Sequence, residues 1–238
     1  MKSPDPLNIS INGEAIEFVT SFKYLGLWLD PKLTWEDHCD KVYKKMSSRV
    51  NLIVRHHHSF CKRQLKVYCD SLVMSVLGYL LPVWGSICPS RLDAFDSIMI
   101  RLVKKVLIKK SIFATSRSLV DEFEIQNWFL ASERRDESML KYFFKHFILN
   151  DPLNFLMSEF FVLRSTPDTD RCVRKERNLV LPRTRTVFGQ SSFSYRVAKR
   201  WNELPNDVQS AKTLTEFTEK LKRFIVSSRP DHYLLRFT

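Results

Sequence analysis

The feature that most constrains the fold is a change in hydrophobic period near Thr34. Before it, apolar and polar residues alternate over 7–11 and 14–18, and Asn12-Gly13 between them is a strong two-residue hairpin turn signal. After it, apolar residues recur at helical spacing, at Val42, Met46, Val50, Ile53 and Val54. The sequence therefore predicts a mainly α fold that begins with β-hairpins.

The strands and helices can be placed more closely. We expect another strand over 22–29, and because one or two hairpins are not stable alone in water, these strands should pack on the helices that follow. Thr34 with Asp37 resembles a capping box that starts the first helix, Ser90 with Asp93 caps a later one, and Thr213 with Glu216 forms another box. Beyond the first, the helices are expected at 62–81 (ending before Pro82), from Ser90, and at 131–149, 152–163, 191–203 and 213–228.

These elements divide the chain into three regions. Residues 1–30 are expected to form a strand region, 31–112 a multi-helix bundle and 113–238 a C-terminal helical region. The last contains a long, irregular basic loop over 164–190. It also contains an apolar stripe that is expected to be core, formed by Leu140, Phe143, Phe144, Phe147 and Ile148.

The formal net charge of +12 indicates a polyanionic partner, either nucleic acid or an anionic membrane. The simpler alternative is a basic protein whose charge only keeps it soluble. Residues 71–89 carry no charge and approach the length of a membrane span, but Gly78, Pro82 and Gly85 interrupt them, so we expect a buried helix and a turn rather than a span. The first ten residues lack the apolar segment of a signal peptide, and we expect a nuclear or cytoplasmic protein without membrane contact.

Catalytic motifs are missing from the sequence. Two-metal nucleotidyl transfer needs converging carboxylates, and the chain has no Asp-Asp pair. Asp30, Asp37 and Asp40 lie close together in the sequence, but Asp37 and Asp40 fall at the entry to a helix and are expected to serve capping and solvation. Five cysteines without a CxxC pair do not predict a disulfide framework, and the histidines near Cys39 and Cys61 lack a second pair of zinc ligands. We expect no catalysis, cofactor or metal in this chain alone.

A family resemblance appears in the segment Phe22–Asp30 with the Leu33-Thr34-Trp35 and His38 that follow. It resembles the block KYLGxxLDxxLTWxxH that follows the palm in jockey-like reverse transcriptases of LINE-type (non-LTR) retrotransposons. A second block resembles the tail of the same open reading frames, and Leu81-Pro82-Val83-Trp84-Gly85 resembles a turn of their thumb region. The second block consists of Arg183-Thr184-Arg185, Gly189-Gln190, Ser192-Phe193, Tyr195, Trp201-Asn202 and Leu204-Pro205.

The resemblance implies roles for these regions. The strand from Phe22 to Gly26 would be the primer grip, with Lys23 and Tyr24 touching nucleic acid, and the helices from Trp35 to Lys110 would form a thumb along the template–primer duplex. It implies a C-terminal fragment of an RNA-directed DNA polymerase, with Met1 an internal methionine of a longer or decayed transposable element. Fingers, palm and the Mg²⁺ site would lie upstream, and the partners would be RNA and DNA together with that missing palm.

Charge supports nucleic-acid binding independently of the resemblance. Residues 41–69 contain many cations and no acid, and an amphipathic helix with one purely basic face suits a phosphate backbone, although a solvated charged face is the alternative. A second basic stretch, 171–185, is either a linker that positions the last helices or an arm that orders on RNA. The candidate contacts in the two stretches are Lys41, Lys44, Lys45, Arg49, Lys62, Arg63 and Lys66, and Arg174, Lys175 and Arg177.

Two other classes of function remain open from the sequence. One is a domesticated, non-enzymatic protein that uses the same basic face to bind RNA or DNA. The other is a helical protein-interaction module whose positive charge is incidental.

Overall fold

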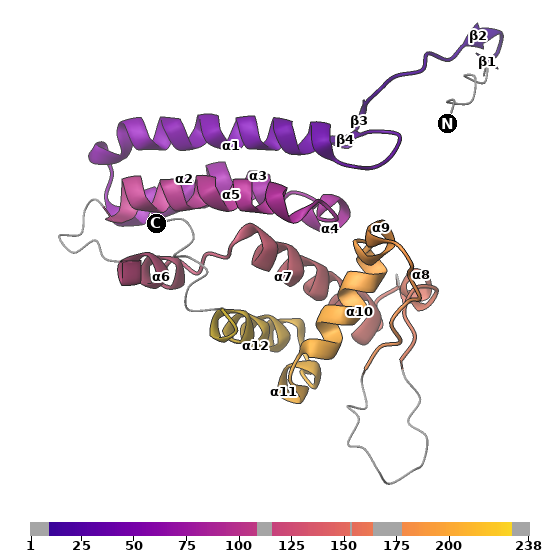
Figure 1. The fold of residues 1–238 in the computed structure, drawn as a ribbon. Coiled ribbons are helices and arrows are strands. Elements are labelled where there is room, and N and C mark those ends of the chain that lie inside the picture. Colours follow the sequence, from indigo (N-terminus) through magenta and orange to yellow (C-terminus); the bar gives the residue numbers. More distant parts are fainter. Residues whose placement is uncertain (1–9, 109–115, 153, 164–177, 230–238) are drawn as a thin grey trace.

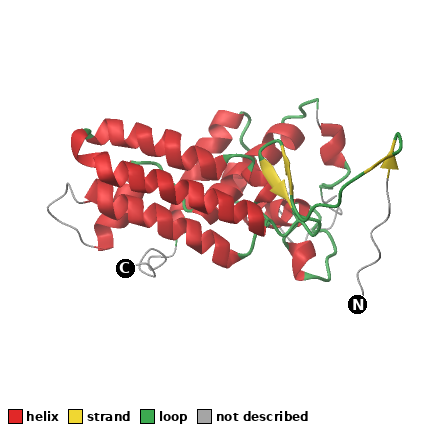
Figure 2. Ribbon diagram, turned by 90° about the horizontal axis from the view of Figure 1, so that it is seen from above, coloured by secondary structure: helices red, strands yellow, loops and turns green. Residues whose placement is uncertain are grey.

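The computed structural model describes residues 10–108, 116–152, 154–163 and 178–229. It is mainly helical, with two small hairpins at the N-terminal end followed by many helices, which confirms the predicted fold class (Figure 1, Figure 2).

The first hairpin pairs β1 (Ser10–Ile11) with β2 (Glu14–Ala15). Its turn residues, Asn12 and Gly13, both have positive φ, at 51° and 86°, as the Asn-Gly signal predicts. The expectation that this hairpin packs on the helices was wrong. It projects away from the helical body (Figure 1), and Ile11 at its centre is 63% exposed, because strands of two residues bury almost nothing.

The second hairpin corrects the single strand expected over 22–29. The chain reverses at Leu25 and Gly26, both with left-handed φ, so that β3 (Phe22–Tyr24) pairs with β4 (Leu27–Leu29). Leu27 is buried in the helical core, so this hairpin does pack on the helices.

Helix α1 (Glu36–His56) buries the predicted apolar face, including Val42, Met46 and Val50. The predicted Thr34–Asp37 capping box was wrong. The carboxylate of Asp30 instead accepts hydrogen bonds from the backbone N–H groups of Thr34 (3.0 Å) and Trp35 (2.9 Å), and from the Thr34 hydroxyl (3.1 Å). Asp30 therefore fixes the loop that leads from the hairpin into α1.

The predicted helix at 62–81 is interrupted. It runs as α2 (Lys62–Cys69), a π-helical turn (Asp70–Met74) and α3 (Ser75–Gly78), and then breaks at Leu80, which has a left-handed φ of 49°. We expected Pro82 to lie just beyond the end of a helix. It lies instead in the first turn of α4 (Leu81–Trp84), where its missing N–H has little cost.

The uncharged residues 71–89 include much of the first hydrophobic core. Leu77, Leu81 and Trp84 are fully buried there. Across the described residues, no helix combines the length and the apolar character that crossing a membrane requires.

The next helices lie close to their predicted positions, but their N-caps differ from the predicted ones. Helix α5 (Pro89–Leu102) begins one residue before the expected Ser90, its N-cap is Cys88 rather than Ser90, and a π-helical turn (Val103–Leu107) follows. Helix α6 (Ser116–Ile125) comes next. The helix expected at 131–149 is confirmed as α7 (Ala131–Phe143) with the π-helical turn Phe144–Ile148.

The C-terminal helices are shorter than expected at one place. Helix α8 spans only Asn154–Ser158, whereas 152–163 was expected. Where a single helix was expected at 191–203, α9 (Val187–Gln190) precedes α10 (Phe193–Glu203). Two more helices, α11 (Asn206–Gln209) and α12 (Leu214–Ser227), complete the described chain.

The predicted cap of α12 is only half reciprocal. The Thr213 hydroxyl accepts from the Glu216 N–H (3.1 Å), as a capping box requires. The Glu216 carboxylate accepts from the N–H of Lys212 (2.9 Å), one residue before the position that the box predicts.

The helices stack in layers, with α1 on one side, then α2, α3 and α5, then α6 and α7, and α12 beyond, while α10 crosses α7 (Figure 1). One hydrophobic cluster fills the layers from α1 to the start of α7, and a second surrounds the rest of α7. The predicted apolar stripe lies in the second cluster: Leu140, Phe143 and Phe144 are buried, and Phe147 and Ile148 are partly buried against it. The predicted boundaries near 30 and 112 stay predictions.

Long-range contacts hold the first turn of α7. The buried carboxylate of Asp96, on α5, accepts a hydrogen bond from the Ala131 N–H (2.6 Å). Arg229, just after α12, donates to both carboxylate oxygens of Glu133 (2.7 and 2.9 Å) and to the Trp128 carbonyl (3.1 Å). The start of α7 is thus bonded to one segment that precedes it in the sequence, at Asp96, and to one that follows it, at Arg229.

Candidate nucleic-acid interface

An open hollow of about 450 Å³ lies between the β3–β4 hairpin, α1 and the segment from the π-helical turn to the end of α3. Four of the predicted contact residues line it, namely Lys23, Lys41, Lys45 and Arg49. Among the described residues, no Asp or Glu side chain lines it. We call this feature the basic hollow. Of the predicted candidates, these four are the ones that the fold brings together.

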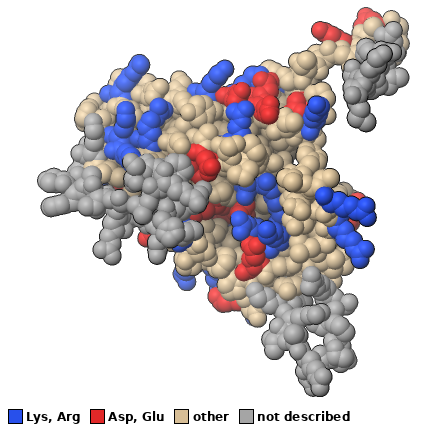
Figure 3. All heavy atoms as spheres, viewed as in Figure 1, with Lys and Arg blue, Asp and Glu red and all other residues tan. Residues whose placement is uncertain are grey.

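Helix α1 supplies three of the four cations because of its period. Lys41, Lys45 and Arg49 are four residues apart and share one face, while Met46 and Val50 bury the opposite side. In Figure 3, blue atoms are spaced along the top of the molecule, where α1 lies, and red atoms gather near the end of α1 that adjoins the hairpin. The face is therefore basic along the helix and mixed only at its start.

Lys41 is held in place by two contacts. Its ammonium lies 2.8 Å from the Asp37 carboxylate and 3.3 Å from the centroid of the Trp28 ring. The hydrogen bond from Lys41, together with one from the Ser21 hydroxyl, lowers the pKa of Asp37. Asp37 thus remains a carboxylate near neutral pH and competes with any anion for Lys41.

Lys45 and Arg49 differ in how they are engaged. Arg49 donates to the Leu72 carbonyl (2.6 Å), which fixes the side chain against the opposite wall. Lys45 is exposed and makes no ion pair with any described residue. Lys45 therefore offers all three of its N–H donors to a ligand.

The hairpin forms one wall of the hollow, and two contacts attach it to the helices. The Tyr79 hydroxyl, just after α3, donates to the Leu25 carbonyl in the hairpin turn (2.8 Å). The Trp28 N–H donates to Nδ1 of His38 (3.4 Å). Gly26 lies against Tyr79: it has a φ of 84°, and a Cβ placed there would lie 3.2 Å from the Tyr79 ring. This position therefore requires glycine for both its backbone and its close approach.

His38 forms part of the wall of the hollow and is buried. Burial lowers the pKa of its imidazole, so the ring is neutral at physiological pH. Because Nδ1 accepts from Trp28, the proton is assigned to Nε2, which is buried and has no hydrogen-bond partner among the described residues. The ring packs edge-on against Trp84 and Trp35. His38 supports the hairpin and adds no charge.

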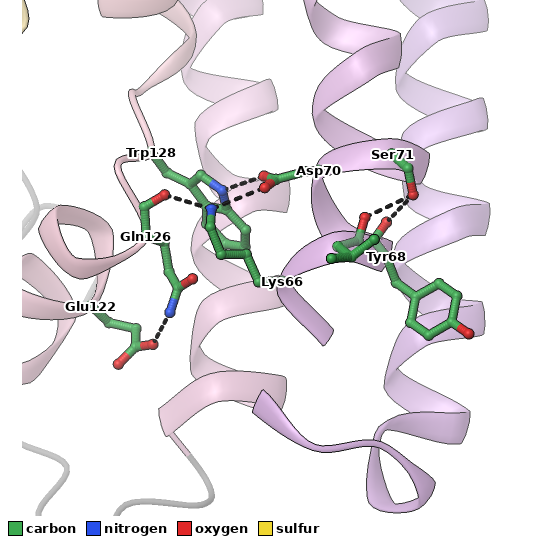
Figure 4. Close-up of polar contacts among 8 residues, drawn as sticks. Lys66, Tyr68, Asp70, Ser71, Glu122, Gln126 and Trp128 are labelled. Carbon is green, nitrogen blue, oxygen red and sulfur yellow. Dashed lines mark hydrogen bonds and ion pairs between the residues drawn. The ribbon is translucent and has the colours of Figure 1, made fainter. Parts of the chain in front are cut away.

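Other predicted residues lie outside the basic hollow. Lys44, Tyr24, Lys62 and Arg63 are exposed and do not line it. Lys66 is bound internally: it donates to the Asp70 carboxylate (2.9 Å) and to the Gln126 carbonyl (2.8 Å) (Figure 4). Its ammonium joins α2 to the loop before α7.

The second basic stretch is described only in part. Arg174, Lys175 and Arg177 lie outside the described residues. From Leu179 onward the chain is tied to α10, because the backbone N–H and carbonyl of Leu179 bond to the Asn202 side chain (2.7 and 2.9 Å). Whether 171–177 is a linker or an RNA-binding arm stays a prediction.

The nearby carboxylates have structural partners. Asp30 caps the loop before α1, Asp37 pairs with Lys41, and Asp40 forms an ion pair with Arg91 of α5. Within the described ranges, no group of three or more His, Cys, Asp or Glu residues could hold a metal ion.

The sequence missed the opposite wall of the hollow, which consists of Ser71, Ser75, Val76 and Tyr79. These residues lie in the uncharged stretch that gave only a core signal. Comparison with known proteins gives no further guide, because no protein-family model, no curated protein and no solved structure matches this chain.

Proposed function

We propose that this chain is the C-terminal part of a LINE-type retrotransposon reverse transcriptase and that it binds the phosphate backbone of a template–primer duplex, or of element RNA, in the basic hollow. The observation that carries the proposal is the hollow itself: four cations line it, and a hairpin attached by Tyr79 forms one of its walls. Cations in a concave site attract phosphate more strongly than cations on a convex face, because the low-dielectric walls focus the field.

The residues of the resembling block support the proposal by their positions. Gly26 permits the turn against Tyr79, Asp30 holds the entry to α1, and His38 accepts from the hairpin backbone. Each contributes to the shape of the hollow, so the spacing of the block has a physical reason. A primer-grip role for this hairpin rests on the resemblance alone.

In this arrangement the chain binds and positions nucleic acid. Lys23 and Lys45 donate to non-bridging phosphate oxygens from two sides, and Lys41 and Arg49 add charge from fixed positions. The carboxylates and the Mg²⁺ of nucleotidyl transfer belong to the upstream palm of the proposed full-length enzyme. A domesticated binding protein would use the same hollow, and a palm encoded upstream of Met1 in the genome would distinguish the enzyme from it.

The test is the salt dependence of binding to a fluorescent DNA duplex. The double variant Lys23→Gln with Lys45→Gln should flatten the slope of log K against log salt by about 0.9 for each lost phosphate contact. The control is Lys62→Gln with Arg63→Gln, which removes the same charge from exposed residues of α2 outside the hollow. Equal slopes for wild type and the first double variant, or a larger change in the control, would refute the proposal.

A further inference from the structure

A second hollow, of about 530 Å³, adjoins the basic hollow and holds a cation that the proposed function does not use. Ser75 and Tyr79 line both hollows, so a strand that leaves the basic hollow past these two residues enters the second one. The far side of the second hollow is formed by the loop before α7 and by Arg134 of α7. We call it the Arg134 hollow.

Arg134 is a partly buried cation that forms no hydrogen bond or ion pair with a described residue, although the carboxylates of Glu137 and Asp70 attract its charge. Its Nε is buried and has no hydrogen-bond partner among the described residues, and its guanidinium forms no ion pair with them. Burial lowers the pKa of the Arg134 guanidinium, although Glu137 and Asp70 oppose this effect. Partial burial of a charge that forms no ion pair is costly, and such a charge beside an open hollow suits a site whose counter-ion is a ligand.

The charge balance of the Arg134 hollow favours an anion. Asp70 is its acidic lining residue, and both carboxylate oxygens are occupied: Oδ1 accepts from the Trp128 indole (2.6 Å) and Oδ2 from Lys66 (2.9 Å) (Figure 4). The Lys66 ammonium also donates to the Gln126 carbonyl, which leaves one of its three N–H groups free for another acceptor. Among the residues that line the hollow, Lys66 offsets Asp70, so Arg134 supplies the net positive charge of the lining.

We infer that the Arg134 hollow binds a phosphodiester group of the same nucleic-acid strand that occupies the basic hollow, with Arg134 as its donor and with Lys66 neutralising the neighbouring Asp70. This inference rests on the proposed function. The planar guanidinium suits two phosphate oxygens at once, and the shared Ser75 and Tyr79 place the two phosphate sites along one path. Arg134 would thereby connect the helix that joins the two hydrophobic clusters to the bound strand.

The experiment compares Arg134→Gln and Arg134→Lys with wild type on the same DNA duplex. Arg134→Gln should flatten the salt slope by about 0.9, and Arg134→Lys should keep the slope because it keeps the charge. Thermal melting of Arg134→Gln without ligand should not fall, because the cost of desolvating this charge outweighs its attraction to Glu137 and Asp70. Arg223→Gln, on the exposed face of α12, removes an arginine that lines neither hollow and serves as the matched control.

The outcomes separate the two proposals. If Arg134→Gln binds with the wild-type slope while Lys23→Gln with Lys45→Gln flattens it, the inference is overturned and the proposed function stands. If wild type shows no salt-dependent binding, both are overturned. If inorganic phosphate at constant ionic strength raises the melting temperature of wild type but not of Arg134→Gln, while duplex slopes stay equal, the site takes free phosphate and the inference is again overturned.

Discussion

Two parts of the same acid-free basic stretch have different surroundings. The cations on one face of α1 line a concave site under the β3–β4 hairpin, whereas those of α2 either stay exposed, like Lys62, or bind within the protein, like Lys66. Composition treats the two parts alike. For the proposed function, this difference means that charge marks the candidate region, whereas a distant segment that forms the opposite wall determines which of its cations line a concave site.

The largest expected effect tests whether duplex binding depends on the contact between the hairpin and Tyr79 of the opposite wall. Gly26→Ala places a Cβ against the Tyr79 ring on a left-handed backbone, which should cost about 1–2 kcal/mol and weaken duplex binding roughly tenfold by displacing the hairpin. Gly13→Ala is the matched control, since Gly13 has a similar φ (86°) and nothing within 4 Å of the added Cβ. Fluorescence anisotropy at fixed salt measures both, and equal affinities for the two variants would contradict a role for the hairpin.

A smaller effect should separate the two kinds of lysine. Lys66→Met removes the contacts to Asp70 and the Gln126 carbonyl and should lower the free energy of unfolding by about 0.5–1 kcal/mol, a figure reduced by the partial exposure of both charges. Lys45→Met should leave stability nearly unchanged and weaken duplex binding. Urea denaturation and anisotropy on both variants check this. If Lys45→Met lowered the free energy of unfolding as much as Lys66→Met does, Lys45 would also have a structural role and the two lysines would not differ.

The smallest effect concerns the acid at the rim of the basic hollow. Because the folded-state pKa of Asp37 is lowered, its contribution to stability is present above its unfolded pKa of about 4 and is lost as pH falls through the folded pKa. Asp37→Asn should remove that loss below pH 4 and, at pH 7 and low salt, tighten duplex binding a few-fold by releasing Lys41. Unchanged binding at pH 7 would show that Lys41 does not contact phosphate.

Periodicity predicted the strongly amphipathic elements, because burial decides them: α1 begins close to the expected start near Thr34, and α12 and α7 with its π-helical turn lie within a few residues of their expected bounds. Caps and turns were harder. Asp30, rather than Thr34, accepts the hydrogen bonds of the free backbone N–H groups before α1. Leu25 adopts a left-handed conformation, which its residue type does not predict. Local sequence does not encode which distant carboxylate or aromatic ring stabilises such a position.

The candidate site was predictable on one side only. The basic residues of α1 stand out because no acid interrupts them, but Tyr79 and Ser75 lie in a stretch whose only sequence signal is burial. The sequence did not single out Arg134 either. It lies in a helix of mixed charge, and the missing hydrogen-bond partner of its Nε can be seen only in the tertiary structure. The walls of the hollow come from segments that lie apart in the sequence, so the second wall could be identified only from the three-dimensional structure.

The first turn of α7 has a consequence for the order of folding. The groups that complete it come from Asp96, 35 residues earlier, and Arg229, 96 residues later than Glu133. Closing such long loops costs entropy before their contacts form, so α7 should be consolidated late, after α5 and α12 are in place. A nascent or truncated chain that ends before Arg229 would lack its bonds to Glu133, so the first turn of this helix, which carries the proposed phosphate donor Arg134, would be held less firmly.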